Sequence, residues 1–122
     1  MSFQQIMEDY GADYHQTMAR FMNNQGMYLR LMDMLFRDKN MGLLEESLAN
    51  GDLGAAFEAA HALKGVSANM GLTPFYNAVS VIVEPLRARQ PGADYPAMLA
   101  RIQTEFARLP ALRDALKAAA GK

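Results

Sequence analysis

The chain contains no cysteine, which excludes disulfide bridges, thiolate catalysis and most zinc sites. No apolar run approaches the roughly 20 residues that a membrane-spanning helix needs, and the first residues lack a basic segment followed by an apolar one. We therefore expect no membrane association and a cytoplasmic location. The basic residues are scattered, and 12 Lys and Arg against 13 Asp and Glu give a net charge of -1, which argues against nucleic-acid binding.

Strand signals are also scarce. β-branched residues gather only around Val79 to Val83, inside a longer helical pattern. The chain has 122 residues, of which 51% are hydrophobic, and this is the size and composition of one globular domain. The sequence therefore predicts a single all-α domain over residues 1–122.

Punctuating residues mark the ends of the central helices. Gly51 followed by Asp52 predicts a stop and then an N-cap, so that a helix covers about residues 53–70. Gly71 offers a left-handed residue at its end, and Thr73 followed by Pro74 predicts the N-cap and first position of the next helix. These signals predict two long helices joined by a tight turn.

The remaining helices follow from apolar spacing. We expect helices over Ala12–Phe21 and Met27–Phe36 with Gly26 between them, and one over Asn40–Ala49. A last helix begins after Asp94, Pro110 kinks or breaks it, and residues 118–122 fray. Because the connections are short, we predict an antiparallel up-and-down four-helix bundle with one or two additional N-terminal helices, its core filled by many of the ten methionines.

His61 is the residue that asks for a chemical explanation. On a wheel of the helix 53–70 it lies about 120° from the centre of the apolar stripe, on the solvent side. Lys64 follows one turn later, and Gly65 follows four residues later at a cost of about 1 kcal/mol to the helix, which indicates close approach of a partner. The predicted docking strip around His61 consists of Gly54, Glu58, Gly65 and Ala68, with Phe57 and Lys64 at its edge.

Several kinds of chemistry at His61 are excluded because the sequence lacks the additional residues that they require. Only His15 and His61 could supply imidazole ligands, without His-x-x-x-His spacing, so we expect no metal site. No triad or oxyanion hole is visible. The remaining interpretation is nucleophilic attack by His61 on a group that a partner delivers. With a phosphoryl group, Lys64 would balance the added charge, and the partner would supply the Mg²⁺.

The run from His61 to Gly65, His-Ala-Leu-Lys-Gly, together with Ala-Asn-Met-Gly at 68–71, closely resembles the histidine-containing phosphotransfer (HPt) domains of multistep phosphorelays. The resemblance covers about residues 15–117. It implies that His61 accepts a phosphoryl group from a receiver-domain aspartyl phosphate, that Lys64 supports it and that Gly65 leaves room. Many members carry Gln or Glu twelve residues after the final glycine of the motif, where this chain has Val83.

The resemblance also implies the partners and the limits of the activity. These partners are response regulator receiver domains and the receiver domain of a hybrid sensor kinase. No autokinase activity is expected, since ATP-binding motifs are absent, and a monomer is the simpler form for a carrier.

Two alternatives remain open. One is a docking or inhibitory protein that binds receiver domains or a sensor kinase through the same face without phosphorylation. The other is an unrelated helical adaptor. For the remaining polar residues we expect structural roles: His15 lies outside the motif, Asn69 is a helix-end residue, and Arg87 and Arg89 are cations that suit a helix C-terminus.

Overall fold

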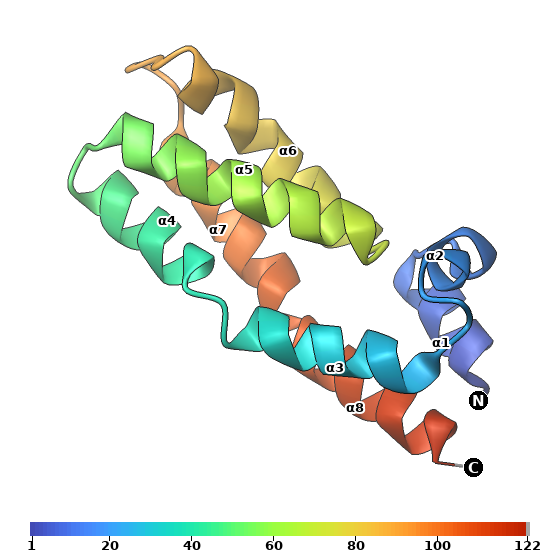
Figure 1. Cartoon of the computed structure of the whole chain (residues 1–122). Coiled ribbons are helices and arrows are strands. Elements are labelled where there is room, and N and C mark those ends of the chain that lie inside the picture. Colours follow the sequence, from blue (N-terminus) through green and yellow to red (C-terminus); the bar gives the residue numbers. More distant parts are fainter. Residues whose placement is uncertain (122) are drawn as a thin grey trace.

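The computed structural model describes residues 1–121, and all regular secondary structure in that range is α-helical (Figure 1). The predicted all-α fold is therefore confirmed. The helices of the described chain are α1 (Phe3–Tyr10), α2 (Tyr14–Arg20), α3 (Gln25–Phe36), α4 (Asn40–Ala49), α5 (Leu53–Asn69), α6 (Thr73–Arg87), α7 (Tyr95–Ala107) and α8 (Leu109–Ala120).

Helices α4 to α7 form the predicted four-helix bundle. Each packs against the next along the chain, and the amide of Gln103 on α7 donates a 2.6 Å hydrogen bond to the Glu45 carboxylate on α4. The α3 and α8 helices lie next to each other beyond the ends of α4 and α7, with α1 and α2 at the same end of the molecule (Figure 1). Helices α1 to α3 thus precede the bundle, and α8 follows it.

An ion pair joins α3 to α8. The Arg113 guanidinium donates two hydrogen bonds to the Asp33 carboxylate, of 2.8 Å from Nε and 3.0 Å from Nη2. These hydrogen bonds hold the pKa of Asp33 below its usual range and raise the pKa of Arg113. The contact fixes the long extension of the bundle on which α1 packs.

Methionines fill part of the core, as the sequence predicts. Met7, Met18 and Met32 are almost completely buried, whereas Met22 and Met34 are exposed. A flexible, unbranched thioether suits the irregular junction between the bundle and the helices α1 to α3. The core role therefore holds for some of the methionines and not for all of them.

Two predicted helix boundaries are wrong. Gly26 lies in the first turn of α3 and does not separate two helices, because Asn24 caps α3 by accepting a hydrogen bond from the backbone of Met27 (2.9 Å). The chain reverses earlier, where Met22 and Asn23 adopt positive φ angles of 52° and 57°. The sequence pattern favoured a break between the helices at Gly26, but the packing of α2 decides where the chain reverses.

Thr73 is also not an N-cap. The backbone of Leu72 occupies that position, and Thr73 is the first residue of α6. The buried Leu72 side chain enters the core, which shifts the start of the helix by one residue.

The C-terminal segment differs from its prediction as well. The predicted break near Pro110 is confirmed, since α7 ends at Ala107 and Pro110 occupies the first turn of the separate helix α8. Fraying from residue 118 is wrong, because α8 continues to Ala120 and the side chains of Ala119 and Ala120 are partly covered by the core. Residue 122 lies outside the described residues.

The turn between α5 and α6 packs tightly on α2. Gly71 has a φ of 65°, and a Cβ at this position would overlap the side chain of Thr17, which is itself buried. The glycine is therefore required by its backbone conformation and by the closeness of α2.

We predict that Gly71→Ala lowers the free energy of unfolding by about 2 kcal/mol or more, because the left-handed conformation and overpacking each add a penalty. Gly51→Ala is the matched control, since Gly51 also has a positive φ (73°) but no atom within 4 Å of the added Cβ. It should lose only about 1–2 kcal/mol. Urea unfolding measures both, and equal losses would show that the contact with Thr17 does not matter.

Candidate functional site

The site is built on α5, which is held at both ends. Asp52 caps the N-terminus by accepting a hydrogen bond from the backbone of Ala55 (3.0 Å). At the other end, Arg20 donates hydrogen bonds to the carbonyls of Ala68 and Asn69 (3.1 and 3.2 Å), groups that the last turn of a helix otherwise leaves unpaired. The residues in the middle of α5 therefore occupy fixed positions.

The buried face of α5 consists mainly of small residues. Ala56, Ala59, Ala60, Leu63 and Ser67 are buried. The Ser67 hydroxyl donates to the Lys64 carbonyl within the helix (3.0 Å), which removes the cost of an unpaired buried hydroxyl. The opposite face of α5 is exposed and carries His61.

His61 is exposed, and an aromatic ring supports it. The Phe57 ring lies parallel to the imidazole, with centroids 5.4 Å apart and an interplanar angle of 10°. Within residues 1–121 no side chain or backbone group forms a hydrogen bond with the His61 ring. The sequence placed Phe57 at the edge of a docking strip and missed this stack, although the spacing of four residues on one helix was the signal for it.

Val83 is buried completely within the core. Its side chain therefore belongs to the packing of α6. The close neighbour of the imidazole is instead the apolar ring of Phe57. Val83 cannot form the polar contact that a Gln or Glu at this position could offer.

Lys64 and Gly65 lie next to His61 at the surface. Together with Ala68 and Tyr76 these residues line a shallow hollow of about 290 Å³. The Lys64 ammonium lies 5.9 Å from the centre of the Tyr76 ring, at the outer limit of a cation–π contact. Tyr76 comes from α6 and could not be found from sequence spacing, because only the packing of α6 on α5 brings it here.

The other predicted docking residues differ in their surroundings. Gly65 is exposed, and a Cβ added to it would have no atom within 4 Å. Glu58 and Ala68 are also exposed. Gly54 is partly covered, because the Arg89 guanidinium lies 3.7 Å from the position of its absent Cβ. The open strip is therefore shorter than predicted at its N-terminal end.

Arg87 and Arg89 do more than end α6. Arg89 donates hydrogen bonds to the carbonyls of Leu86 (2.6 Å) and Arg87 (3.5 Å), as expected for a cation at a helix C-terminus. In addition, the two guanidinium carbons lie 5.0 Å and 5.4 Å from the centre of the Phe57 ring. These contacts connect α6 to the aromatic neighbour of His61, and no local pattern in the sequence reveals them.

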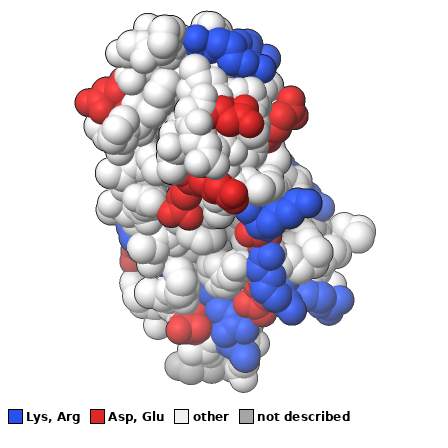
Figure 2. All heavy atoms as spheres, turned by 90° about the vertical axis from the view of Figure 1, so that its left-hand side faces the viewer, with Lys and Arg blue, Asp and Glu red and all other residues white. Residues whose placement is uncertain are grey.

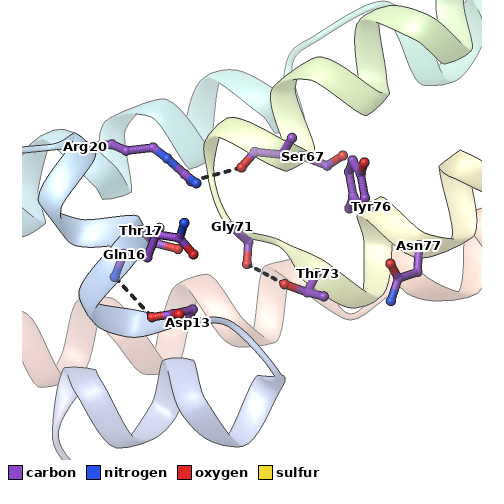
Figure 3. A pocket seen from close by; sticks show the side chains of 10 residues that line it. Asp13, Gln16, Thr17, Arg20, Ser67, Gly71, Thr73, Tyr76 and Asn77 are labelled. Carbon is purple, nitrogen blue, oxygen red and sulfur yellow. Dashed lines mark hydrogen bonds between the residues drawn. The ribbon is translucent and has the colours of Figure 1, made fainter.

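A second hollow, of about 260 Å³, is lined by α2, the α5–α6 turn and the first turns of α6 (Figure 3). Arg20 from α2 lies on one side of it and Thr73 and Asn77 from α6 on the other (Figure 3). Ala68 and Tyr76 line this hollow as well as the one at His61, so the two lie side by side. The N-terminal helices therefore extend the surface around His61.

His15 lies on α2, outside both hollows. Its ring contacts the Tyr14 ring edge-on and is 3.5 Å from the Gln4 amide nitrogen. Among residues 1–121, no three His, Asp or Glu side chains are grouped as a metal site would require. In that same range no helix has the length and apolarity to span a bilayer.

The geometry thus presents one exposed imidazole on a rigid helix with a lysine and an open glycine beside it. The Hpt domain family matches residues 30–120 of the chain, a range that includes all of α4 to α8. The chain belongs to the Hpt domain family. Hpt domains are helical bundles that carry phosphoryl groups on histidine in phosphorelays, so this general role applies to the chain. No curated protein sequence and no solved structure matches the chain.

The Hpt match leaves α1 and α2 outside its range. Arg20 and Thr17 of α2 nonetheless contact the C-terminal end of α5 and the turn that follows it. Residues that precede the matched range therefore help to hold the helix that carries His61.

Gly65 gives a test of what the Hpt fold itself requires. We predict that Gly65→Ala raises the free energy of unfolding by about 0.5–1 kcal/mol, because alanine is the better helix former and its methyl group meets no other atom. Gly42→Ala on α4 is the control, since that site is equally open. Thermal or urea unfolding measures both. A loss of stability in Gly65→Ala alone would mean that the fold requires the glycine.

Proposed function

We propose that the chain is a phosphorelay carrier in which His61 accepts a phosphoryl group from the aspartyl phosphate of one receiver domain and passes it to another. The observation that carries this proposal is the exposed imidazole in the middle of a helix fixed at both ends. A nucleophile on a rigid, open surface can meet a buried phosphoryl group only when the partner's active site closes over it.

The proposed reaction is a phosphoryl transfer without a bound cofactor on this chain. A lone pair on an imidazole nitrogen forms the N–P bond while the P–O bond to the partner's aspartate breaks, and the carboxylate leaves with the electron pair. The proton of the attacked ring passes to water. The partner receiver domain supplies Mg²⁺ for the charge on the phosphoryl oxygens, and Lys64 supports the charge of the phosphorylated ring.

Partner docking uses the face around His61. Gly65 and Ala68 provide an exposed, low surface next to the imidazole, and Glu58 lies one turn before it. Gly54 and Phe57 form the end of this face under the arginines of α6. The partners in this proposal are response regulator receiver domains and the receiver domain of a hybrid sensor kinase, which a monomeric carrier meets in turn without autokinase activity of its own.

The second candidate is a protein that docks on receiver domains or on a sensor kinase through the same face and is never phosphorylated. The exposed surface is equally suited to it. The presence of both His61 and Lys64 beside an open glycine favours the carrier, because docking alone needs neither a nucleophile nor its countercharge.

The central prediction is phosphorylation of His61. Incubation with a phosphorylated receiver domain and Mg²⁺ should yield an adduct that is labile in acid and stable in alkali, as a phosphoimidazole is. His61→Gln should abolish the adduct, and His15→Gln should retain it as the matched control. Equal labelling of His61→Gln and the parent chain would refute the assignment. Tight binding of receiver domains without any adduct would favour the docking protein.

Close approach of the partner is tested at Gly65. A leucine there projects into the space that the partner must occupy, so Gly65→Leu should slow transfer from a phosphorylated receiver domain by about tenfold or more, the effect of an overpacked contact. Gly42→Leu, at an open position on α4, should transfer at the parent rate. A parent-like rate in Gly65→Leu would show that the partner does not approach this part of α5.

A further inference from the structure

The imidazole of His61 is held by its face and not by its nitrogens. Phe57 precedes it by one turn of α5, and the two rings are nearly parallel at an interplanar angle of 10° with centroids 5.4 Å apart. A hydrogen bond to the ring would occupy one nitrogen. Stacking instead contacts the face of the ring and occupies neither nitrogen.

The Phe57 ring is itself restrained from α6. The Arg87 and Arg89 guanidinium carbons lie 5.0 Å and 5.4 Å from its centre, within the range of cation–π attraction. Figure 2 shows basic side chains together at the upper edge of the molecule, over the C-terminal end of α6. Phe57 is half-buried, so its ring is packed between its own helix and these arginines.

The two arginines are held in turn by their own contacts. Arg87 forms an ion pair with Glu84 one turn earlier on α6 (3.3 Å). Arg89 donates to the Leu86 carbonyl (2.6 Å). Each guanidinium therefore has a polar partner that keeps it near the Phe57 ring. The result is a chain of contacts that runs from the end of α6, through one phenyl ring, to the imidazole.

Without this support, an exposed histidine side chain rotates freely among its rotamers. Residue 83, where many Hpt domains carry Gln or Glu, is a valine buried in the core. An imidazole that samples many orientations presents its nitrogen to the phosphorus atom for only part of the time, and the rate of attack falls in proportion.

We propose that Phe57 is a positioning residue for His61: its ring, held by Arg87 and Arg89, stacks on the imidazole and orients a free ring nitrogen toward the incoming phosphoryl group. The proposal rests on the proposed function, because orientation matters only if the ring reacts. In the step served by the stack, the nitrogen lone pair forms the N–P bond, the bond from phosphorus to the leaving group breaks, and the ring proton goes to water.

Phosphoramidate tests the orientation separately from docking, because this small phosphoryl donor needs no protein surface. In that reaction the P–N bond of the donor breaks and ammonia leaves. Phe57→Leu keeps an apolar side chain but removes the ring, and should slow labelling of His61 by about 2- to 10-fold, the range expected for loss of an aromatic pair. Phe57→Tyr keeps the ring and should restore most of the rate.

Nuclear magnetic resonance gives a readout that a merely structural role would not change. The carbon-bound protons of the His61 ring should be shifted upfield by the ring current of Phe57 in the parent chain and in Phe57→Tyr. In Phe57→Leu they should move toward the positions of a free histidine. The ring protons of the other histidine, His15, provide the internal reference. His15 lies on α2 in contact with Tyr14, so its shifts should not change in the Phe57 variants.

The arginines provide a second, independent variant at exposed positions. Arg87→Gln combined with Arg89→Gln should slow phosphoramidate labelling and reduce the upfield shift in the same direction as Phe57→Leu. Arg101→Gln, at an exposed site on α7, is the matched control and should leave both unchanged. This pair keeps the proposal testable if Phe57→Leu proves to be unfolded.

The outcomes separate this proposal from the proposed function. A Phe57→Leu chain that is labelled at the parent rate, with unchanged His61 ring shifts, overturns the positioning role and leaves the carrier intact. A slower transfer from receiver domains alone, with normal phosphoramidate labelling, makes Phe57 a docking contact and also overturns it. Failure of the parent chain to accept phosphate from any receiver domain refutes the proposed function instead.

Discussion

The burial of one face of α5 between its neighbours fixes the position of every residue in the site. That face is rich in alanine, so the neighbouring helices α4 and α6 can approach it closely. The ends are fixed as well, by Asp52 at one and by Arg20 at the other. With its backbone held in this way, α5 can carry a glycine at residue 65, although glycine weakens a helix.

In the proposed transfer, the exposed face of the same helix divides the chemistry between this chain and its partners. His61 would be the nucleophile, Lys64 would supply a positive charge, and Gly65 would leave room for the partner to approach. Within residues 1–121, His61 borders a shallow hollow shared with Tyr76 and no enclosed pocket. In the proposed transfer, a water-excluding active site would therefore form in the complex with a receiver domain. The open arrangement suits the proposed carrier, because an imidazole enclosed by its own protein could not meet two partners in turn.

Two segments outside the reactive helix complete the site. The C-terminal end of α6 brings Arg87 and Arg89 onto Phe57, the ring that stacks on His61. At the opposite end, α2 packs on the α5–α6 turn and borders a hollow that shares Ala68 and Tyr76 with the one at His61. The matched Hpt region begins at residue 30, so this second contribution comes from residues that precede the match.

The sequence alone determined the all-α fold, the motif helix to within one residue and the exposure of His61. These features depend on local signals: helical periodicity, the Asp52 cap, the left-handed Gly71 and the motif from His61 to Gly65. The placement of α2, the covering of Gly54 and the correct start of α3 did not follow from such signals. They depend on contacts between residues far apart in the chain.

Tertiary structure alone decided how the aromatic ring beside the imidazole is restrained. The stack with Phe57 was within reach of sequence reasoning, since both rings lie on one face of α5. The restraint of the Phe57 ring by Arg87 and Arg89 could not be predicted from the sequence, because the register of α6 against α5 determines which side chains meet. The same register turns Val83 into the core and Tyr76 toward Lys64. Local propensity specifies each helix by itself, whereas the packing of two buried faces determines which exposed residues become neighbours.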